Sequence, residues 1–154
     1  MINRDMVGKA FPSIKYVVTR EKIIELIQAI GEPNPLYYDQ ETAKTEGYPD
    51  IVAPPTFVTL AGYWTGASYK ILRELGVTPP IALHGEEEYE YGVEIHPGDI
   101  LTGESRLLSI EEKHGKSGPM ELVRIETAYT NQRGEQVVRV TSLTVVKRER
   151  GEKI

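Results

Sequence analysis

The segment from Pro55 to Leu75 constrains the fold most, because nearly every residue in its first two-thirds is apolar or small. Pro54 and Pro55 stand at its start, where proline is favoured in a first helical turn, and Gly76 follows its last residue. We therefore predict one helix over residues 55–75, roughly 30 Å long. A helix that is apolar on all sides is buried, so the rest of a soluble chain must wrap around it.

Several residues within this segment carry further expectations. Gly62 and Gly66 lower helix propensity, which predicts close approach by another backbone. The aromatic residues Phe57, Tyr63 and Trp64 are expected in the core. Both expectations follow from a helix that has no solvent-facing side.

The remaining chain alternates between helical and strand patterns. Thr19 to Ile30 has one apolar helical face, with Thr19 as N-cap and Gly31 as the stop. A short helix begins after Asp39 and ends at Gly47. Strands are predicted, with boundaries approximate, over Lys15 to Val18, Leu83 to Ile95, Ile100 to Glu112, Met120 to Thr130 and Glu135 to Lys147.

This order of elements predicts the fold class. One strand, then helices, then an antiparallel meander is typical of an α+β protein with a curved sheet wrapped around a central helix. The length of 154 residues predicts a single domain over residues 1–154. A half-covered helix and an open sheet edge also predict a dimer.

Composition excludes several classes of function. The formal net charge of −5 disfavours nucleic acid as a partner, and the absence of cysteine excludes disulfides and thiolate chemistry. His84, His96 and His114 are far apart in the sequence, so we predict no metal site. No dinucleotide-binding or P-loop motif is present. These exclusions leave acid–base chemistry by carboxylate, histidine and tyrosine, or binding alone.

The two ends of the chain bear on localisation and on partners. Residues 1–11 lack the apolar region of a signal peptide, and no apolar run is long enough to span a bilayer, which predicts a cytoplasmic protein with no membrane partner. A basic cluster at the C-terminus is expected to be a solvated tail, with contact to a cofactor phosphate as the alternative. It comprises Lys147, Arg148, Arg150 and Lys153.

A proline-rich connection between the first two helices carries a family resemblance. The run Gly31-Glu-Pro-Asn-Pro-Leu-Tyr37 within residues 29–43 resembles the hydratase 2 motif of MaoC-like hydratases and dehydratases. Three later features match that family in order: residues 47–52, the apolar helix, and residues 93–101 with their Pro-Gly-Asp turn. The resemblance implies a hot-dog fold.

The resemblance also implies a chemistry. Such proteins add water to trans-2-enoyl thioesters or remove it from (3R)-3-hydroxyacyl thioesters, in fatty-acid or related metabolism, with the acyl chain in a tunnel beside the central helix. An aspartate and a histidine of the motif handle the water, and a donor at the thioester oxygen stabilises the enolate. No cofactor is implied, because coenzyme A or phosphopantetheine enters only with the substrate.

The chain departs from the family pattern at the positions that handle protons. Glu32 stands where the aspartate is expected and Tyr37 where the histidine is expected. Pro54 and Pro55 replace a His-Gly pair, and proline has no N–H to donate, so the N–H of Thr56 is the nearest substitute. These departures are similar to N-terminal dehydratase domains and to substrate-holding subunits, whose partner supplies the aspartate–histidine pair.

Candidate site residues follow from these comparisons, each beside a structural alternative. Glu32 with Tyr37 or His84 is predicted to be catalytic, whereas a loop carboxylate, a packed aromatic ring and a structural histidine are the alternatives. Asn34 is expected to hold its own turn and to shape the site. The predicted substrate-binding residues are Asn34, Pro55, Thr56, Phe57, Tyr63 and Trp64.

The predicted strand that contains His84 carries several glutamates. Glu86, Glu88 and Glu90 are expected to form a solvated face. Glu87 is two positions before Tyr89, and regular alternation places both side chains on the same face of the strand. Either a bulge therefore shifts the register, or a buried carboxylate has a partner.

Three functions remain open. The first is a hydro-lyase acting on enoyl or (3R)-hydroxyacyl thioesters of coenzyme A or acyl carrier protein. The second is an acyl-binding subunit, whose partner is a MaoC-like subunit with an aspartate–histidine pair rather than a second copy. The third and weaker is a thioesterase, because one fold hosts several reactions.

Overall fold

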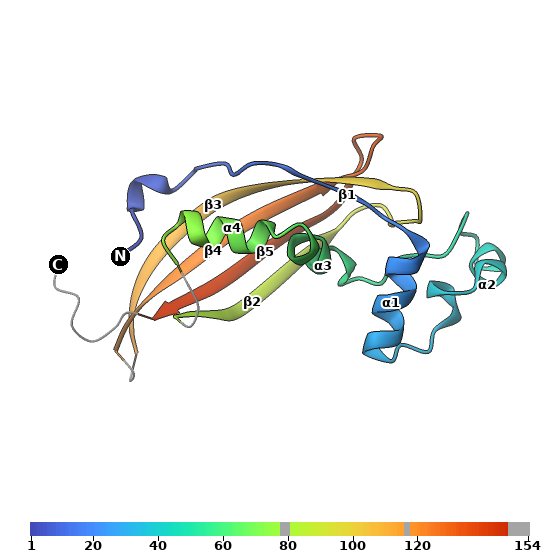
Figure 1. Cartoon of the computed structure of the whole chain (residues 1–154), viewed down its shortest axis with the longest axis horizontal. Helices are drawn as coiled ribbons and strands as arrows, with labels where there is room; N and C mark the ends of the chain where they lie inside the picture. The colour runs from blue at the N-terminus through green and yellow to red at the C-terminus, as the bar shows by residue number, and fades with distance from the viewer. Residues whose placement is uncertain (78–80, 116–117, 148–154) are drawn as a thin grey trace.

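An antiparallel sheet curves around two helices in the computed structural model, which describes residues 1–77, 81–115 and 118–147 (Figure 1). The five strands of the described sheet lie in the order β1-β3-β4-β5-β2. Their bounds are β1 (Ile14–Val17), β2 (Ala82–Tyr91), β3 (Ile100–Gly115), β4 (Gly118–Thr130) and β5 (Gln136–Lys147). The α+β class with a curved sheet around a central helical layer is confirmed.

The helices occupy two places (Figure 1). α3 (Phe57–Trp64) and α4 (Ala67–Glu74) lie across one face of the sheet, whereas α1 (Arg20–Ile30) and α2 (Gln40–Thr45) lie beyond one end of it. Short 3-10 turns, η1 (Arg4–Met6) and η2 (Pro35–Tyr37), complete the described elements. None of the helices among the described residues has the length and apolarity needed to cross a membrane.

The ends of α1 follow the local rules of helix termination. The Thr19 hydroxyl accepts a hydrogen bond from the N–H of Lys22 at 3.3 Å, and Gly31 ends the helix with φ of 68°. The buried face consists of Ile23, Leu26 and Ile27. The predicted helix, cap and stop are therefore confirmed.

The predicted single helix over residues 55–75 is wrong in one respect, because the segment breaks into α3 and α4. Gly66 adopts φ of 68° between them, and an added Cβ there would meet no atom within 4 Å. Gly66 is thus required by its left-handed backbone and not by close packing. At Gly62 an added Cβ would lie 2.7 Å from Ser68 Oγ, so its close neighbour is a side chain of α4 and not another backbone.

The expectation that this segment is buried on all sides is also wrong. Phe57 is fully buried, but Tyr63 is 66% exposed and Trp64 is 39% exposed. The reason is that α3 packs on the sheet with one face only, while the described chain covers its other face incompletely. There Trp64 stacks on the Tyr16 ring, with centroids 5.2 Å apart.

β2 contains the irregularity that its glutamates suggested. Its pairing with β5 shifts between His84 and Glu86, which leaves Gly85 as the extra residue of a bulge. Glu87 then faces the helices beside Tyr89, whose hydroxyl donates a hydrogen bond to the Glu87 carboxylate. Both alternatives proposed for Glu87, the bulge and the partnered carboxylate, therefore hold together.

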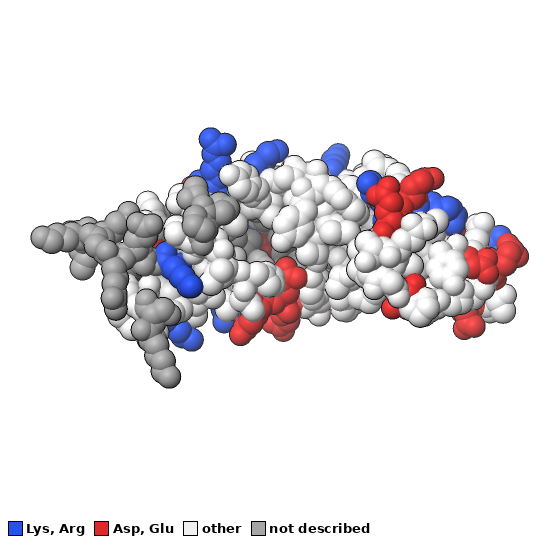
Figure 2. All heavy atoms as spheres, turned by 60° about the horizontal axis from the view of Figure 1, so that its bottom comes forward, with Lys and Arg blue, Asp and Glu red and all other residues white. Residues whose placement is uncertain are grey.

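The outer face of the sheet carries charge. As predicted, Glu86, Glu88 and Glu90 are solvent-exposed, and acidic side chains gather over β2 in Figure 2. Arg139 lies 3.7 Å from the Glu90 carboxylate and 3.5 Å from that of Glu126. Of the predicted basic cluster, Lys147 is the exposed last residue of β5, whereas Arg148, Arg150 and Lys153 lie outside the described residues.

Two apolar clusters hold the layers together. One joins α1 and α3 to the first residues of β3 and of β5, and includes Phe57, Leu101 and Val138. The other joins α4 to the middle of β3 and β4, and includes Leu107 and Val123. The clusters hold α3 and α4 against the sheet and leave hollows beside them.

Candidate functional site

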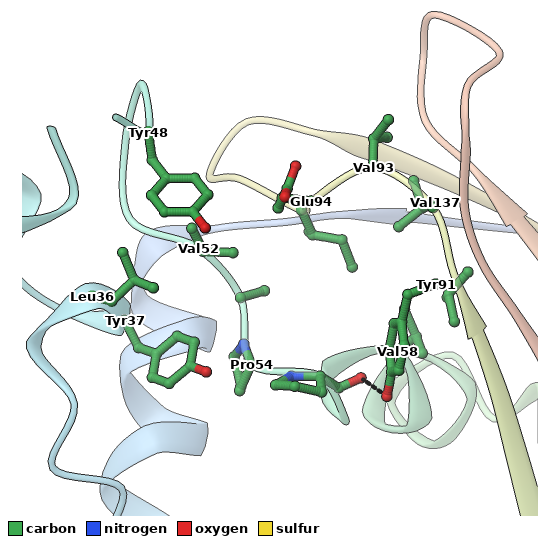
Figure 3. Close-up of a pocket in the computed structure, with 15 residues that line it drawn as sticks. Leu36, Tyr37, Tyr48, Val52, Pro54, Val58, Tyr91, Val93, Glu94 and Val137 are labelled. Atoms are coloured by element: carbon green, nitrogen blue, oxygen red, sulfur yellow. Dashed lines mark hydrogen bonds between the residues drawn. The ribbon is translucent and has the colours of Figure 1, made fainter. Parts of the chain in front are cut away.

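A cavity of about 240 Å³ opens beside the start of α3 (Figure 3). Its walls come from residues 36–58, from residues 91–95 at the end of β2, and from β5. Most of the wall is apolar. The lining residues are Leu36, Tyr37, Tyr48, Val52, Ala53, Pro54, Pro55, Val58, Tyr91, Gly92, Val93, Glu94, Ile95, Val137 and Val138.

A few polar groups interrupt the apolar wall. Tyr37 and Tyr48 lie on one side of the cavity and Tyr91 lies on the other (Figure 3). The Tyr91 hydroxyl donates a hydrogen bond to the carbonyl oxygen of Pro55 at 3.4 Å, and burial raises the pKa of Tyr91. Phenol groups of this kind donate hydrogen bonds at neutral pH but are poor bases. The cavity is therefore suited to hold an apolar chain with a carbonyl group among hydroxyls.

Local hydrogen bonds fix the wall that carries Tyr37. The side chain of Asn34 accepts a hydrogen bond from the N–H of Leu36 at 3.0 Å and begins η2. Glu32 in turn accepts from the N–H of Asn34 at 3.0 Å. The expectation that Asn34 holds its own turn is confirmed, and this turn presents the Tyr37 ring to the cavity.

Contacts between distant segments hold the two walls at a fixed separation. The N–H of Ala53 donates to the carbonyl oxygen of Ile95 at 2.8 Å. His96 has its Nδ1 at 2.9 Å from the carbonyl oxygen of Ile51, so this histidine has a structural role in joining the two segments. The cavity is thus built into the fold.

Comparison with known proteins identifies the family. Residues 5–140 match the family described as FAS1-like, dehydratase domain region. The chain belongs to this dehydratase-domain family. Among its relatives, a UPF0336 protein of Streptomyces avermitilis is 34% identical over 152 residues, which cover 97% of this chain and 99% of that protein.

Solved structures show the same fold. The MaoC-like dehydratase from Rhodospirillum rubrum superposes with a TM-score of 0.66 at 26% identity, covering 97% of this chain and 99% of that chain. A chain of the HadBC (3R-hydroxyacyl-ACP dehydratase) complex from Mycobacterium tuberculosis superposes with a TM-score of 0.76 at 23% identity, covering 92% and 97%. The hot-dog fold and the MaoC-like resemblance are therefore confirmed.

In this dehydratase-domain chain the predicted catalytic residues do not meet. Tyr37 lines the cavity described above, but Glu32 lines a separate groove with Ile24 and Tyr38. His84 lines a third hollow, beneath α4. The fold therefore does not bring Glu32, Tyr37 and His84 together at one reacting centre within this chain.

The predicted substrate-binding residues also lie in different parts of the structure. Pro55 lines the cavity, and Thr56 precedes α3 with an exposed side chain that forms no capping hydrogen bond. Phe57 lies in the core, and Trp64 packs on Tyr16 at the surface. Tyr63 lines the hollow beneath α4.

Three polar residues of the cavity were not singled out by the sequence: Tyr48, Tyr91 and Glu94. The alternating pattern of β2 could have indicated the direction of Tyr91, because Tyr91 lies on the same face of the strand as Tyr89. Glu94 follows the end of the strand, where alternation no longer predicts direction. Within residues 1–77, 81–115 and 118–147, no three His, Asp or Glu side chains cluster in a way that could hold a metal ion.

Proposed function

We propose that this chain binds trans-2-enoyl or (3R)-3-hydroxyacyl thioesters and takes part in their hydration or dehydration together with a partner subunit. The carrier is coenzyme A or an acyl carrier protein. The observation that carries the proposal is the cavity beside α3, whose wall is apolar and whose only polar side chains among the described residues are Tyr37, Tyr48, Tyr91 and Glu94. Such a lining accommodates an acyl chain and offers donors to a thioester oxygen.

The dependence on a partner follows from what this lining lacks. Adding or removing water requires a group that accepts the α-proton and a group that serves the β-hydroxyl. Among the described residues no histidine lines the cavity, and the Glu32 carboxylate is turned toward the Asn34 N–H outside it. The HadBC dehydratase of M. tuberculosis is itself a complex of subunits. A MaoC-like partner with an aspartate–histidine pair would complete the site.

Catalysis by the chain alone, as a homodimer, is the second candidate. Glu94 is a carboxylate in the cavity wall and Tyr37 is a hydroxyl donor across from β2, so the cavity has both a base and an acid. This candidate predicts activity without any second protein.

A reconstitution assay separates the two candidates. The chain is purified alone, and also with a MaoC-like protein encoded in the same genome, and hydration of trans-but-2-enoyl-CoA is followed by loss of enoyl absorbance. The proposal predicts activity only for the pair. Activity of the chain alone that is lost in Glu94→Gln, but kept in the surface control Glu104→Gln, would instead establish the second candidate. Release of free thiol would indicate a thioesterase.

A further inference from the structure

The hollow beneath α4 that contains His84 lies between the helices and the inner face of the sheet, and with its extension beneath α3 we call it the inner chamber. Its larger part, about 270 Å³, lies beneath α4, and a smaller part of about 80 Å³ lies beneath α3. Both parts are lined by Tyr63, Ser68, Glu87 and Ser142. Hydroxyl and carboxyl groups are thus abundant at a place where a hydrocarbon-binding tunnel would carry aliphatic side chains.

A chain of hydrogen bonds borders the chamber and joins α3 to β2. The Tyr89 hydroxyl donates its one proton to the Glu87 carboxylate. Thr59 Oγ1 lies 2.5 Å from the same hydroxyl, so Thr59 donates to Tyr89. Burial, and then the hydrogen bond to Glu87, raises the pKa of Tyr89 to about 12. The phenol therefore stays protonated and keeps Glu87 oriented toward the chamber.

Other polar groups of the chamber lack partners within the described part of the chain. Tyr129 is 5% exposed, and its hydroxyl forms no hydrogen bond with the described residues. Ser68 Oγ likewise forms none with them. By contrast, Thr127 is paired with Ser105 at 2.9 Å. Because a buried hydroxyl group ordinarily has a hydrogen-bonding partner, Tyr129 indicates that a polar group binds beside it, where the half-buried Ser68 also lines the chamber.

The charged side chains of the lining limit which chemical groups the chamber can bind. The lining includes the Glu87 carboxylate and, toward the outside, His84, but neither lysine nor arginine among the described residues. An anionic group would therefore meet Glu87 without a compensating cation. A plain alkyl chain would cover Tyr129 and Ser68 and leave their hydroxyls unpaired, which is costly. A hydroxyl group satisfies both constraints, because it donates to Glu87 and accepts from Tyr129.

The chamber lies next to the cavity of the proposed function. Val58 contributes to the walls of both. Along β2, Tyr91 faces the cavity, and Tyr89 and Glu87 follow on the same face, with the two tyrosine rings stacked 5.8 Å apart. Tyr91 and Glu87 are four positions apart along the strand, a distance of roughly 13 Å. A medium-length acyl chain that begins at the cavity is therefore long enough to reach the chamber.

We propose that the inner chamber binds the distal part of an acyl chain that carries a hydroxyl group, with Glu87 and Tyr129 as its hydrogen-bonding partners. This inference rests on the proposed function, since it places the thioester end in the cavity beside α3. It adds a substrate class: acyl chains hydroxylated far from the thioester.

Binding of saturated esters tests the inference without catalysis. Isothermal titration calorimetry compares ω-hydroxydecanoyl-CoA with decanoyl-CoA on the full chain. The hydroxylated ester should bind about 10-fold more tightly or better, the size expected for a hydrogen bond to a charged group. In Tyr129→Phe and in Glu87→Leu the preference should fall to less than about 3-fold. Glu88→Leu, on the outer face of the same strand, should keep it.

The outcomes separate the two proposals. Equal affinity of the unaltered chain for both esters, or a preference that survives both Tyr129→Phe and Glu87→Leu, would overturn the chamber assignment and leave the proposed function standing. Failure of both esters to bind would overturn the proposed function and the chamber assignment with it. Tyr129→Phe changes a single hydroxyl and therefore keeps the test interpretable if Glu87→Leu does not fold.

Discussion

Replacing Gly66 by alanine tests the break between α3 and α4, because the broken and the continuous helix predict opposite signs. With φ of 68° and no atom within 4 Å of an added Cβ, the substitution meets backbone strain and no clash. A left-handed conformation costs a non-glycine residue about 1 to 2 kcal/mol, so Gly66→Ala should lower the free energy of unfolding by that amount. In a continuous helix the same change would raise it by about 1 kcal/mol.

Urea unfolding followed by circular dichroism measures this difference well, since the changes in the free energy of unfolding expected for the broken and the continuous helix differ by roughly 2 to 3 kcal/mol. Gly66→Asn is the matched variant, because asparagine tolerates the left-handed region and should lose less stability than alanine. Equal slopes for the variants would show that the unfolded state is unchanged. A Gly66→Ala protein that is more stable than the unaltered chain would refute the break.

Three further predictions concern the loop, the cavity and an ion pair. Asn34→Ala removes the cap of η2 and should lower the free energy of unfolding by about 1 kcal/mol in the urea assay; an unchanged midpoint would contradict the role of the cap. Tyr37→Phe, in the presence of the partner, should lower kcat/KM about 10-fold at an unchanged melting temperature, and an unaltered kcat/KM would remove Tyr37 from the site. Burial opposes the ionisation of Asp50, but hydrogen bonds from Arg20 and from the Ile51 N–H outweigh it and lower the Asp50 pKa. Because the unfolded chain then binds more protons, this stabilisation is present above about pH 4 and is lost as the pH falls through the folded pKa. Arg20→Gln should therefore reduce stability more at about pH 6 than at about pH 3, and an equal loss at both would contradict the ion pair.

Local sequence rules accounted for much of the fold. Thr19 and Gly31 delimit α1 through side-chain and backbone hydrogen bonds that involve only nearby residues, so the sequence was sufficient to predict them. The break at Gly66 was not predictable in the same way. A glycine within a helical pattern is compatible with close packing and with a left-handed turn, and only the path of the neighbouring elements decides between them.

The site was less predictable because cavity walls combine segments that are distant in sequence. Tyr37 and Glu32 are neighbours in the motif, yet the prolines between them direct one to the cavity and the other to a separate groove. The bulge at Gly85 places His84 opposite Thr144 on the inner face, and its position depends on pairing with β5. Tyr129 shows no sequence signal of function, since its place beside Glu87 arises from the packing of β4 under α3.

Hydrogen–deuterium exchange during titration with trans-but-2-enoyl-CoA tests most directly where the thioester binds. The cavity beside α3 predicts slower exchange in peptides covering residues 48–58 and 91–95, with little change in residues 24–33, which border the separate groove. Protection confined to residues 24–33, or absent from the wall around Tyr91, would show that the thioester binds elsewhere and would contradict the assignment of the cavity.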